Sequence, residues 1–573
     1  MPTPLSIARA TGTLGARSGL RGGAGGNHQP KKTMSDTQTT DDLKQELEKR
    51  LTFAIISHPD AGKTTITEKL LLFGGAIHIA GAVKSKKNDR ATVSDFMKME
   101  QERGISVSTS VMGFMYGGRR VNLLDTPGHA DFSEDTYRTL TAVDSALMVI
   151  DSVKGVEERT RALAKVCRMR TTPIITFMNK FDRDGRPPIE LLDQVEEELD
   201  IQVCPMDWPI GSGQHFKGVY RIHEDRTLLF RPHATDEEGA TQEIAGLNNE
   251  ELDREVGSAL ADQLREDVEL IREVYEDFDL ESYLAGKQTP VFFGSALNNF
   301  GVRELLEFFA AHAPIPQSRP AVEREVRPEE DSFSGIIFKI HANLDPKHRD
   351  RIAFLRVCSG IFRRNKQYLH VRSGKNFKTA NPTAFMAQQR NIIDEAYPGD
   401  IVGLHDTGTL RIGDTLTEGE KIQFSGIPTF APTIFVNVVN KDPMRSKQLN
   451  KGLDQLCEEG VAQVFSARQG NRRVLGVVGQ LQLDVIAYRL EHEYKATCRF
   501  EPLEYTRAAW VHCGDRDRLN RFLDRYEHRI VYDRTGKPVY LAENQWLLDR
   551  RREEDSDITF RWTADIEAAA QPA

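Results

Sequence analysis

The sequence predicts an α/β domain with a parallel-rich sheet, followed by a small β-barrel domain and an α+β domain. From about residue 51 to residue 314, apolar strand-like runs alternate with helical patterns, which is typical of a parallel sheet covered by helices on both faces. From about residue 332 to residue 427, short strands are broken by Gly and Pro, as in a small β-barrel. After Pro432 strands and helices are mixed again, so a third domain is expected.

Each element is predicted from its apolar pattern. In the first domain, strands are expected at 53–56, 121–124, 146–150, 174–178 and 291–293, and helices at 63–73, 156–169 and 302–311. The barrel strands are expected at 335–339, 353–359, 400–403 and 411–414. The third domain is expected to hold strands 434–439 and 474–478 and helices 447–459 and 480–493. No internal repeat is evident in the sequence.

These patterns divide the 573 residues into four parts. Residues 1–44 are predicted to be a disordered extension, because residues 1–33 contain no Asp or Glu and include a glycine-rich run; a polar, helix-like stretch follows at 41–50. The first domain is placed at 45–318, the β-barrel at 328–427 and the α+β domain at 432–565, with the prolines around 314–320 as a linker.

The composition, with 39% hydrophobic and 28% charged residues and a net charge of −9, is that of an ordinary globular protein. No apolar run approaches the ~18 residues of a membrane-spanning helix, so no membrane partner is expected. The six scattered cysteines exclude a zinc pattern or a disulfide framework and favour a reducing compartment. An acidic insertion at about 190–281 holds 26 acidic and 7 basic residues, a net charge of −19, which leaves +10 for the remainder. We interpret the insertion as a set of solvated helix faces, and the basic remainder is free to face RNA.

The first chemical motif is a phosphate-binding loop between an expected strand and an expected helix. It reads Ser57-His58-Pro59-Asp60-Ala61-Gly62-Lys63-Thr64 and matches G-x-x-x-x-G-K-[ST], except that Ser57 replaces the first glycine. In such a loop, backbone N–H groups and the helix N-terminus surround the β-phosphate. Lys63 is expected to reach the β- and γ-phosphates, and the Thr64 hydroxyl to bind Mg²⁺.

The second motif, Asp125-Thr126-Pro127-Gly128, follows the expected strand 121–124. A carboxylate at this end of a strand can hold Mg²⁺ through water, and the Gly128 N–H can sense the γ-phosphate. His129 comes next, at a position where a side chain can orient the attacking water. A lone loop histidine is usually inert, so its position alone makes it a candidate for catalysis.

The third and fourth motifs concern the base. Asn179-Lys180-Phe181-Asp182 follows the expected strand 174–178, and its last carboxylate can accept hydrogen bonds from guanine N1–H and N2–H₂. Adenine lacks these donors and would leave the carboxylate unsatisfied, which selects GTP. Ser295 and Ala296 follow strand 291–293, where their backbone is expected to contact guanine O6. Four motifs in this order, each after a strand, predict a GTP-binding domain.

A long segment between the first two motifs is predicted to be a switch. It contains Lys84, Lys86, Lys87 and Arg90 and leads to the run Glu102-Arg103-Gly104-Ile105-Ser106. Long loops in compact domains are usually functional. We expect this one to order around Mg²⁺ and the γ-phosphate, with Ser106 as a further metal ligand; the alternative is a disordered surface insertion.

At this point the chain resembles the translational GTPases, in Asp60-Ala61-Gly62-Lys63-Thr64-Thr65, Arg103-Gly104-Ile105, Asp125–His129 and Asn179–Asp182. The runs FAIISHPD (53–60), FSEDTYR (132–138), DPKHRDR (345–351) and EAYPGD (395–400) are similar, more narrowly, to the class II peptide chain release factors. The resemblance covers roughly residues 45–565. Ser57 for glycine, and Ser106 where elongation factors carry threonine, depart from the broader pattern and agree with the narrower one.

The resemblance implies a P-loop GTPase domain, an elongation-factor-Tu-like β-barrel and a third domain specific to these factors. It implies a ribosome-dependent GTPase of translation termination with GTP/GDP and Mg²⁺ as cofactors. The GTP-bound form is expected to promote departure of class I release factors after peptide release, and hydrolysis to release the factor itself. By resemblance, the ribosome positions His129 for hydrolysis. The implied partners are ribosomal RNA and ribosomal proteins, without DNA, for a cytoplasmic monomer.

Two alternatives stay open at this stage. An elongation-factor-G-like translocase or ribosome-protection protein carries further domains, for which the roughly 140 residues after Pro428 are too few. The second alternative is a scaffold that binds GTP without turnover; the presence of His129, Lys63 and Thr64 argues against it. Three basic clusters are candidate ribosome contacts: Lys347, Arg349 and Arg351; Arg363, Arg364 and Lys366; and Arg468, Arg472 and Arg473.

Overall fold

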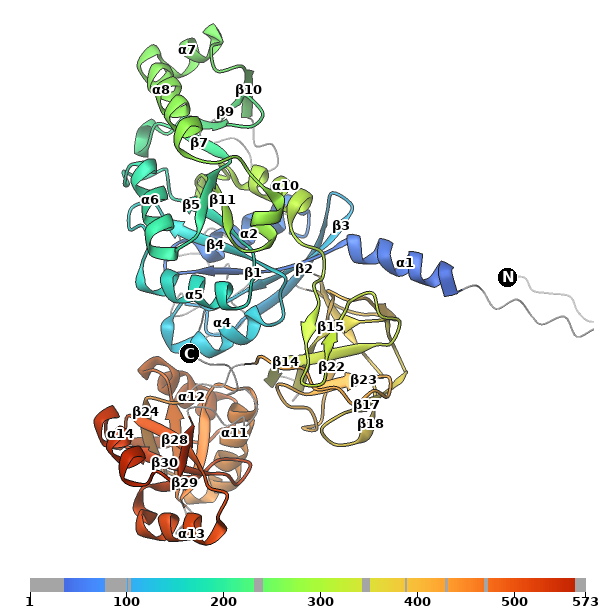
Figure 1. The fold of residues 1–573 in the computed structure, drawn as a ribbon, viewed down its shortest axis with the longest axis vertical. Coiled ribbons are helices and arrows are strands. Elements are labelled where there is room, and N and C mark those ends of the chain that lie inside the picture. Colours follow the sequence, from blue (N-terminus) through green and yellow to red (C-terminus); the bar gives the residue numbers. More distant parts are fainter. Residues whose placement is uncertain are drawn as a thin grey trace, which may run out of the picture.

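The computed structural model describes residues 36–77, 100, 105–230, 241–342, 351–386, 389–427, 431–467 and 472–561. Figure 1 shows three bodies: a large N-terminal domain in blue to green, a β-rich domain in yellow beside its lower end, and a C-terminal domain in orange to red below the large domain and to the left of the β-rich one. The acidic insertion extends from the large domain at the end opposite to the C-terminal domain.

The first domain is built on a seven-stranded sheet of order β2-β3-β1-β4-β5-β11-β6. The β2–β3 pair is antiparallel and the other pairs are parallel. The strands are β1 (Arg50–Ser57), β2 (Ser110–Tyr116), β3 (Arg119–Asp125), β4 (Ser145–Asp151), β5 (Ile174–Asn179), β6 (Gln202–Pro205) and β11 (Gln288–Phe293). All five expected strands lie within this set.

Helices cover both faces of this sheet. One face packs on α4 (Ser133–Leu140), α5 (Glu158–Met169) and α6 (Pro188–Leu199). The other packs on α2 (Lys63–Phe73) and α10 (Val302–His312). Because neighbouring residues of a strand point to opposite faces, every residue of β1 is buried. This explains why the predicted strands read as continuous apolar runs. The predicted helix 63–73 has the same bounds as α2.

The acidic insertion is more than a set of helix faces, and our prediction was incomplete here. It holds an antiparallel sheet of β7 (Asp207–Ile210), β8 (Gly218–Arg221), β9 (Arg226–Phe230) and β10 (Thr241–Ala245). The helices α7 (Glu250–Val256), α8 (Ser258–Val274) and α9 (Leu280–Leu284) follow. Trp208 is buried and its indole N–H donates to Asp267 of α8 at 3.0 Å, which ties the sheet to the helices. Strands of four or five residues leave too short an alternation to recognise in so acidic a sequence.

The second domain is an eight-stranded antiparallel sheet of order β18-β17-β23-β14-β15-β22-β19-β20. Its strands are β14 (Ser334–Ala342), β15 (Arg351–Ser359), β17 (Gln367–His370), β18 (Lys375–Lys378), β19 (Thr383–Met386), β20 (Gln389–Ile392), β22 (Ile401–His405) and β23 (Thr415–Thr417). Short pairs join β12 (Arg319–Pro320) to β13 (Glu325–Val326), and β16 (Phe362–Arg363) to β21 (Glu395–Ala396).

The predicted strand 411–414 is wrong, because it is a turn before β23. Gly413 has a φ of +89°, which suits glycine and not a strand. The Asp414 carboxylate accepts from the Arg411 backbone N–H at 2.7 Å and closes this turn.

The third domain repeats one topology twice, although the sequence shows no repeat. The first copy runs β24 (Ile434–Asn440), α11 (Ser446–Glu458), β25 (Gln463–Ala467), β26 (Arg473–Val477), α12 (Gln480–His492), β27 (Cys498–Pro502). The second runs β28 (Arg507–His512), α13 (Arg516–Arg525), β29 (Ile530–Tyr532), β30 (Pro538–Ala542), α14 (Gln545–Glu554), β31 (Thr559–Arg561). The sheet order β27-β24-β26-β25-β29-β30-β28-β31 joins the copies through their equivalent strands β25 and β29. Each copy is a β-α-β-β-α-β unit.

The faces of the two copies that carry no helix pack on each other. Phe435 and Phe465 of the first copy share a buried cluster with Trp510 and Val531 of the second. The helical faces form separate cores with α11 and α12, and with α13 and α14. The predicted helices 447–459 and 480–493 correspond to α11 and α12.

The predicted disordered extension 1–44 is wrong at its C-terminal end. A helix, α1 (Asp36–Glu48), begins eight residues before residue 44, and Leu43 and Leu47 on one of its faces are buried. Residues 1–35 lie outside the described part of the chain. Among the helices that the structure describes, none has the length and apolar character to cross a membrane. Short 3-10 helices lie at Ala130–Phe132, Gly213–His215, Ala296–Asn298, Pro443–Arg445 and Glu527–Arg529.

Candidate nucleotide site and domain junction

The phosphate loop lies between β1 and α2, as predicted. Asp60 and Gly62 have left-handed φ values of +65° and +99°. A Cβ on Gly62 would come within 2.2 Å of the Asn179 amide nitrogen, so only glycine fits there. Ser57 ends β1 and is buried, and its hydroxyl donates to the His58 carbonyl at 2.9 Å. This backbone course brings the loop amides toward the N-terminus of α2, where an anion is favoured.

Lys63 and Asp125 meet at the carboxyl edge of the sheet. The Lys63 ammonium donates to Asp125 Oδ1 at 2.6 Å, and both side chains are buried. An ammonium has three donors, and Asp125 is its one hydrogen-bond partner within the described residues, so two donors are left for phosphate oxygens. Thr126 fixes the following turn by donating its hydroxyl to the Ile55 carbonyl at 2.7 Å.

The loop after Asp125 touches the phosphate loop through its backbone. A Cβ built on Gly128 would lie 3.3 Å from Pro59 Cα, so these two loops run in close contact. Thr64 occupies the first turn of α2, and Ser106 lies four residues before β2. The hydroxyl and carboxylate oxygens of Thr64, Ser106 and Asp125 are ligands of the kind that Mg²⁺ prefers. Their metal role stays a prediction.

Asn179 links the phosphate loop to the base-binding loops. Its side-chain amide donates to the Ala61 carbonyl at 2.8 Å, and its side-chain oxygen accepts from the Ala296 N–H at 2.9 Å. Asp182 accepts from the Ser295 hydroxyl at 2.6 Å. The sequence predicted Asp182 and Ser295 as neighbours in function, but it gave no sign of the Asn179 link, because the joined residues are more than 100 positions apart.

Lys180 and Phe181 complete this edge. Lys180 has a φ of +71°, and its ammonium donates to Asp151 at 2.6 Å and to the Asp60 carbonyl. Phe181 is buried against Phe293, and its N–H donates to the Gly294 carbonyl at 3.1 Å. Asp151, at the end of β4, was not predicted as part of the site. The sequence did offer a signal for Asp151, because a carboxylate at the end of a predicted central strand lies at the same edge of the sheet as the other motifs.

His129 is 41% exposed and lies directly before the 3-10 helix Ala130–Phe132. Its Nδ1 accepts from the Asp131 backbone N–H at 3.2 Å. In the neutral ring this contact assigns the proton to Nε2. The backbone N–H of Asp131 therefore determines which ring nitrogen of His129 can donate a hydrogen bond. His58, in the phosphate loop, has its Nε2 at 3.2 Å from a carboxylate oxygen of Glu157. Burial lowers the pKa of His58.

The loop that carries His129 also contacts the third domain. Asp131 accepts from the Leu481 N–H at 2.7 Å, in the first turn of α12. A Cβ on Gly479 would lie 1.9 Å from the Asp131 carboxyl carbon, so the close approach requires glycine. Phe132 packs with Val107 and with Val485 of α12 in a small apolar cluster. The N-terminus of α12 is therefore capped by the first domain.

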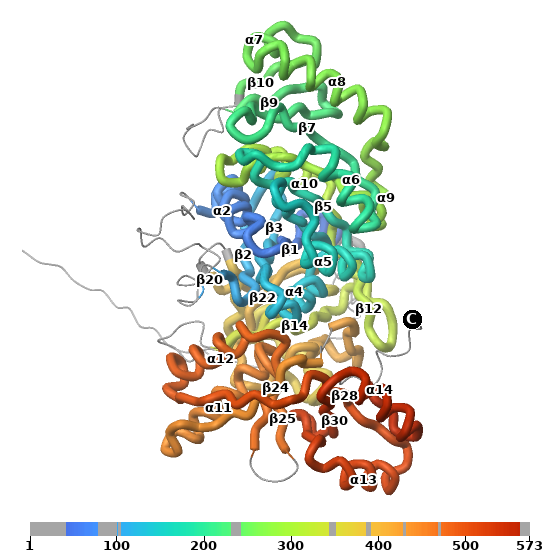
Figure 2. Tube along the Cα trace, turned by 90° about the vertical axis from the view of Figure 1, so that its left-hand side faces the viewer, coloured from blue at the N-terminus to red at the C-terminus, as the bar shows by residue number. Residues whose placement is uncertain are grey.

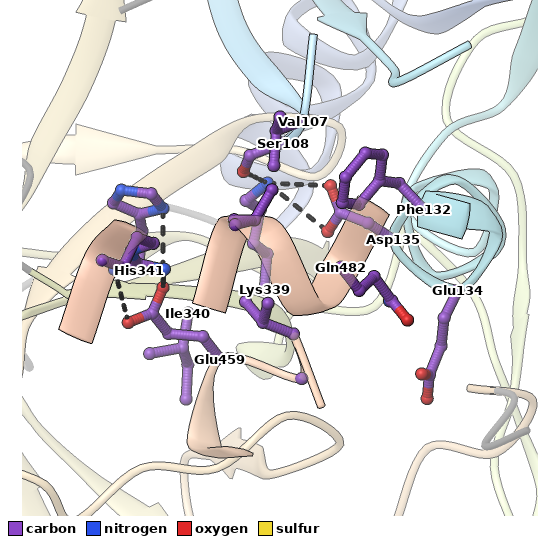
Figure 3. Close-up of a pocket in the computed structure, with 14 residues that line it drawn as sticks. Val107, Ser108, Phe132, Glu134, Asp135, Lys339, Ile340, His341, Glu459 and Gln482 are labelled. Atoms are coloured by element: carbon purple, nitrogen blue, oxygen red, sulfur yellow. Dashed lines mark hydrogen bonds and ion pairs between the residues drawn. The ribbon is translucent and has the colours of Figure 1, made fainter. Parts of the chain in front are cut away.

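All three domains contribute residues to one small pocket (Figure 3). Lys339 of β14 donates to Ser108 at 2.6 Å, to the Thr109 carbonyl at 2.9 Å and to Asp135 at 3.0 Å. Burial raises the pKa of Asp135, but the Lys339 ammonium and the bonds from Thr109 outweigh burial and hold this pKa below its usual value. The Lys339 ammonium thus joins the β-barrel to the segment just before β2 and to α4.

Arg489 of α12 is the second buried cation at the junction. It binds Glu459 at 2.8 and 3.1 Å and Glu493 at 2.7 and 3.1 Å, and it reaches the Ala342 carbonyl of the β-barrel. His341 of β14 lies 3.9 Å from Glu459 (Figure 3). This network joins the second and third domains.

Most of the described basic residues that were predicted to contact the ribosome form ion pairs with carboxylates of this chain. Arg351 is buried between the second and third domains, where it binds Asp406 and Glu458, so its assignment to an exposed basic cluster was wrong. Arg363, Arg364 and Lys366 pair with Glu395, Asp394 and Glu418, Arg473 pairs with Asp454, and Arg472 donates to Asn437. Lys84, Lys86, Lys87, Arg90, Glu102, Arg103, Gly104, Lys347, Arg349 and Arg468 lie outside the described residues.

Three family models match the chain. The elongation factor Tu GTP binding domain matches residues 48–315, elongation factor G domain 2 matches 332–419, and the class II release factor RF3 C-terminal domain matches 424–552. Among solved structures, a crystal structure of a protein from Thermus thermophilus is similar with 22% identity and a TM-score of 0.65, covering 81% of this chain and 70% of that chain. These matches confirm the predicted order of an α/β GTPase domain, a β-rich domain and an α+β domain.

Proposed function

Because this chain belongs to the translational GTPases of the class II release factor type, we propose that it acts at termination on the ribosome. Its GTP-bound form promotes departure of a class I release factor after peptide release, and GTP hydrolysis then releases the chain itself. The proposed site of action is the cytoplasm, and the chain acts as a monomer. It requires neither DNA nor a membrane.

The nucleotide phosphates bind at the edge formed by the phosphate loop, Lys63 and Asp125. The loop amides and the N-terminus of α2 donate to the phosphates, and the Lys63 ammonium uses its two remaining donors for the β- and γ-oxygens. Thr64, Ser106 and Asp125 would hold Mg²⁺, which would neutralise charge on the β- and γ-phosphates. Release of the γ-phosphate would remove the contact that orders the Gly128 loop.

The base is selected by Asp182. Its second carboxylate oxygen accepts from the guanine edge, while the Ser295 hydroxyl donates to the first oxygen at 2.6 Å and fixes the orientation of the carboxylate. The N–H groups of Ser295 and Ala296 donate to the Phe300 carbonyl and to Asn179. The observation that carries the proposal is the Asn179 link, because its two hydrogen bonds hold the phosphate loop and the base loop at a fixed separation.

Hydrolysis adds water to the γ-phosphorus and breaks the bond to the β–γ bridging oxygen, which leaves on GDP; the water proton passes to phosphate. His129 orients this water in the proposal, supported by the Asp131 N–H that donates to its Nδ1 and leaves Nε2 of the neutral ring to carry the proton. Since the His129 side chain is 41% exposed, the ribosome can reach it and move it into position. An outside activator can accelerate a GTPase roughly 10³–10⁵-fold.

The first test is GTP turnover by the purified chain with and without termination-stage ribosomes. We expect slow turnover alone and strong stimulation by ribosomes. His129→Ala should lose the stimulation but keep GTP affinity, whereas His512→Ala, a change at an exposed histidine at the end of β28, should keep both. Tight GTP binding without stimulation would instead favour a scaffold, and full stimulation of His129→Ala would remove that histidine from catalysis.

The second test follows a labelled class I release factor on ribosomes after peptide release. Wild type with GTP should accelerate its departure. His129→Ala should still accelerate this departure but remain bound itself, because only its own release requires hydrolysis. Ribosome-stimulated turnover without any effect on the release factor would contradict the termination role and leave a translocase-like role.

A further inference from the structure

One end of the third domain carries exposed lysines that form no ion pair with a carboxylate in the part of the chain that the structure describes. They lie before and in the first turns of α11 and in the loop after α12: Lys441, Lys447, Lys451 and Lys495. Within the described residues, none of the four ammonium groups pairs with an Asp or Glu, whereas the predicted clusters described above are largely paired. We call residues 440–451 and 495–499 the basic tip.

The fold, and not chance proximity in sequence, brings the two segments of the basic tip together. Strand β24 ends beside the start of β27, with Asn440 opposite Cys498. The Lys441 N–H donates to the Thr497 carbonyl at 3.2 Å, and the Arg445 guanidinium donates to the Lys495 carbonyl. Figure 2 shows α11 and α12 side by side at this end of the domain, and their packing agrees.

The neighbouring carboxylates are mostly engaged by other groups. Asp442 pairs with Arg445 and Glu501 with Arg499, both within or beside the tip. Glu493 pairs with the buried Arg489. Glu491 is exposed on the α12 side and opposes part of the charge. The tip itself, with six basic residues and one acidic residue, carries a net charge of +5.

The start of α11 strengthens this positive field. The helix has 13 residues, no acidic residue in its first turn and no side-chain cap. Lys447 instead lies in that first turn, next to the positive end of the helix dipole, which is an unfavourable place for a cation. Lys495 has a left-handed φ of +56°, which is uncommon for residues with a Cβ. An anion bound at the tip would offset the repulsion that this arrangement creates.

We propose that the basic tip binds the phosphate backbone of RNA, and, resting on the proposed function, that this RNA belongs to the ribosome. Lysines are mobile point charges on long stems and suit phosphates without reading bases. The exposed Met444, 89% accessible in the short helix before α11, adds apolar contact to a ribose or base. Four lysines spread over the two segments of the tip match an extended phosphate backbone better than a single anion.

The tip also has a mechanical relation to the catalytic loop. It lies at the C-terminal end of α12, and Asp131 caps the N-terminal end of the same helix. A helix of 13 residues is about 20 Å long. RNA held at the tip is therefore connected to the loop that carries His129 by one rigid element.

The test compares two variants of the full chain with equal charge loss. One changes Lys441, Lys447, Lys451 and Lys495 to Gln; the matched control changes four exposed lysines elsewhere, Lys165, Lys217, Lys287 and Lys421, to Gln. Binding to vacant ribosomes and to purified large-subunit and small-subunit ribosomal RNA is measured from about 50 to about 200 mM salt. Melting temperatures establish that both variants are folded.

Each phosphate contact contributes about 0.7–0.9 to the slope of log K against log salt. Loss of four contacts should therefore flatten the slope by about 3 for the tip variant, on ribosomes and on one of the two RNAs, with the control close to wild type. Equal slopes for the tip variant and wild type would overturn the proposal. A change on ribosomes without one on either RNA would also overturn it, in favour of an acidic ribosomal protein.

The outcome is separable from the proposed function. If wild-type GTP turnover is not stimulated by ribosomes, the termination role fails, but the slope on purified RNA still decides the tip. If the tip variant loses RNA affinity and regains full ribosome-stimulated turnover at low salt, the tip is a binding surface and not part of catalysis.

Discussion

The nucleotide edge and the three-domain junction both gather buried charges, but they use them differently. At the nucleotide edge, Lys63 holds one carboxylate within the described residues, and the surrounding loops contain left-handed residues such as Asp60 and Gly62. At the junction, Lys339 and Arg489 each hold several partners and lie within strands or helices. Cations with donors to spare belong to a ligand site, whereas cations with filled donors hold domains together. Substitutions in the two regions should therefore fail in different ways.

The largest expected effect is a change of base preference by Asp182→Asn. An amide at this position reverses a hydrogen bond to the C2 side of the purine, so preference should pass from GTP to xanthosine triphosphate by about 10⁴-fold. Competition binding of the two nucleotides measures it, with Asp184→Asn, an exposed carboxylate two residues further on, as control. Stability should change little, because Asn still accepts from Ser295. Retained strict GTP preference would refute the assignment.

Arg489→Met tests the junction and should lower the free energy of unfolding by about 3–5 kcal/mol, since it leaves Glu459 buried without its cation. Denaturant unfolding of the full chain measures this. Arg499→Met removes an exposed pair with Glu501 in the same domain and should cost less than about 1 kcal/mol. GTP affinity should be unchanged in both. Comparable losses for the two variants would mean that the junction network contributes no special stability.

Asp131→Ala removes the cap that the first domain gives to α12 and should cost about 0.5–2 kcal/mol. Asp515→Ala removes the cap of α13 within the third domain and serves as the matched variant. Hydrogen exchange distinguishes them: only Asp131→Ala should speed exchange of the Leu481 amide. Unchanged Leu481 exchange would show that the interdomain cap is not formed in solution.

The smallest expected effect is on stability in acid. The pKa values of Asp135 and Asp400 are lowered in the fold, mainly by Lys339 and by Arg120 with Arg50, against the opposing effect of burial. When the pKa of a carboxyl is lower in the folded state than in the unfolded state, its charge stabilises the fold. This stabilisation is complete at a pH above the unfolded-state pKa and is lost as the pH falls through the folded-state pKa. The melting temperature should thus decline as the pH falls below 3.8, the ordinary pKa of an Asp carboxyl. The decline should be smaller in Lys339→Met. An equal decline in both proteins would contradict the role given to Lys339.

The sequence predicted the nucleotide edge far better than the junction. Helix 63–73 and the strands before each motif could be predicted because their apolar patterns are local and long. Contacts such as Asn179 with Ala61, or Arg489 with Ala342, join residues more than 100 positions apart and leave no local pattern. Arg351 shows the same limit: its charge suggested an exposed surface, but partners distant in sequence bury it.

The repeated unit of the third domain was also not predictable from the sequence. Its two copies share strand order and helix positions, but the residues that fill them differ, because each copy satisfies its own core. Turns were the other weak point. At 411–414 an apolar Ile beside Arg suggested a strand, while Gly413 and the Asp414 side chain determine a turn.

The cap between Asp131 and Leu481 has a consequence for synthesis of the chain. The two residues are 350 positions apart. At 5–20 residues per second, the first domain would wait roughly 20–70 seconds after its own loop is made before its partner helix exists. A nascent or truncated chain can thus fold its GTP-binding domain with the His129 loop still undocked. Completion of the polypeptide itself then becomes the event that assembles the working form.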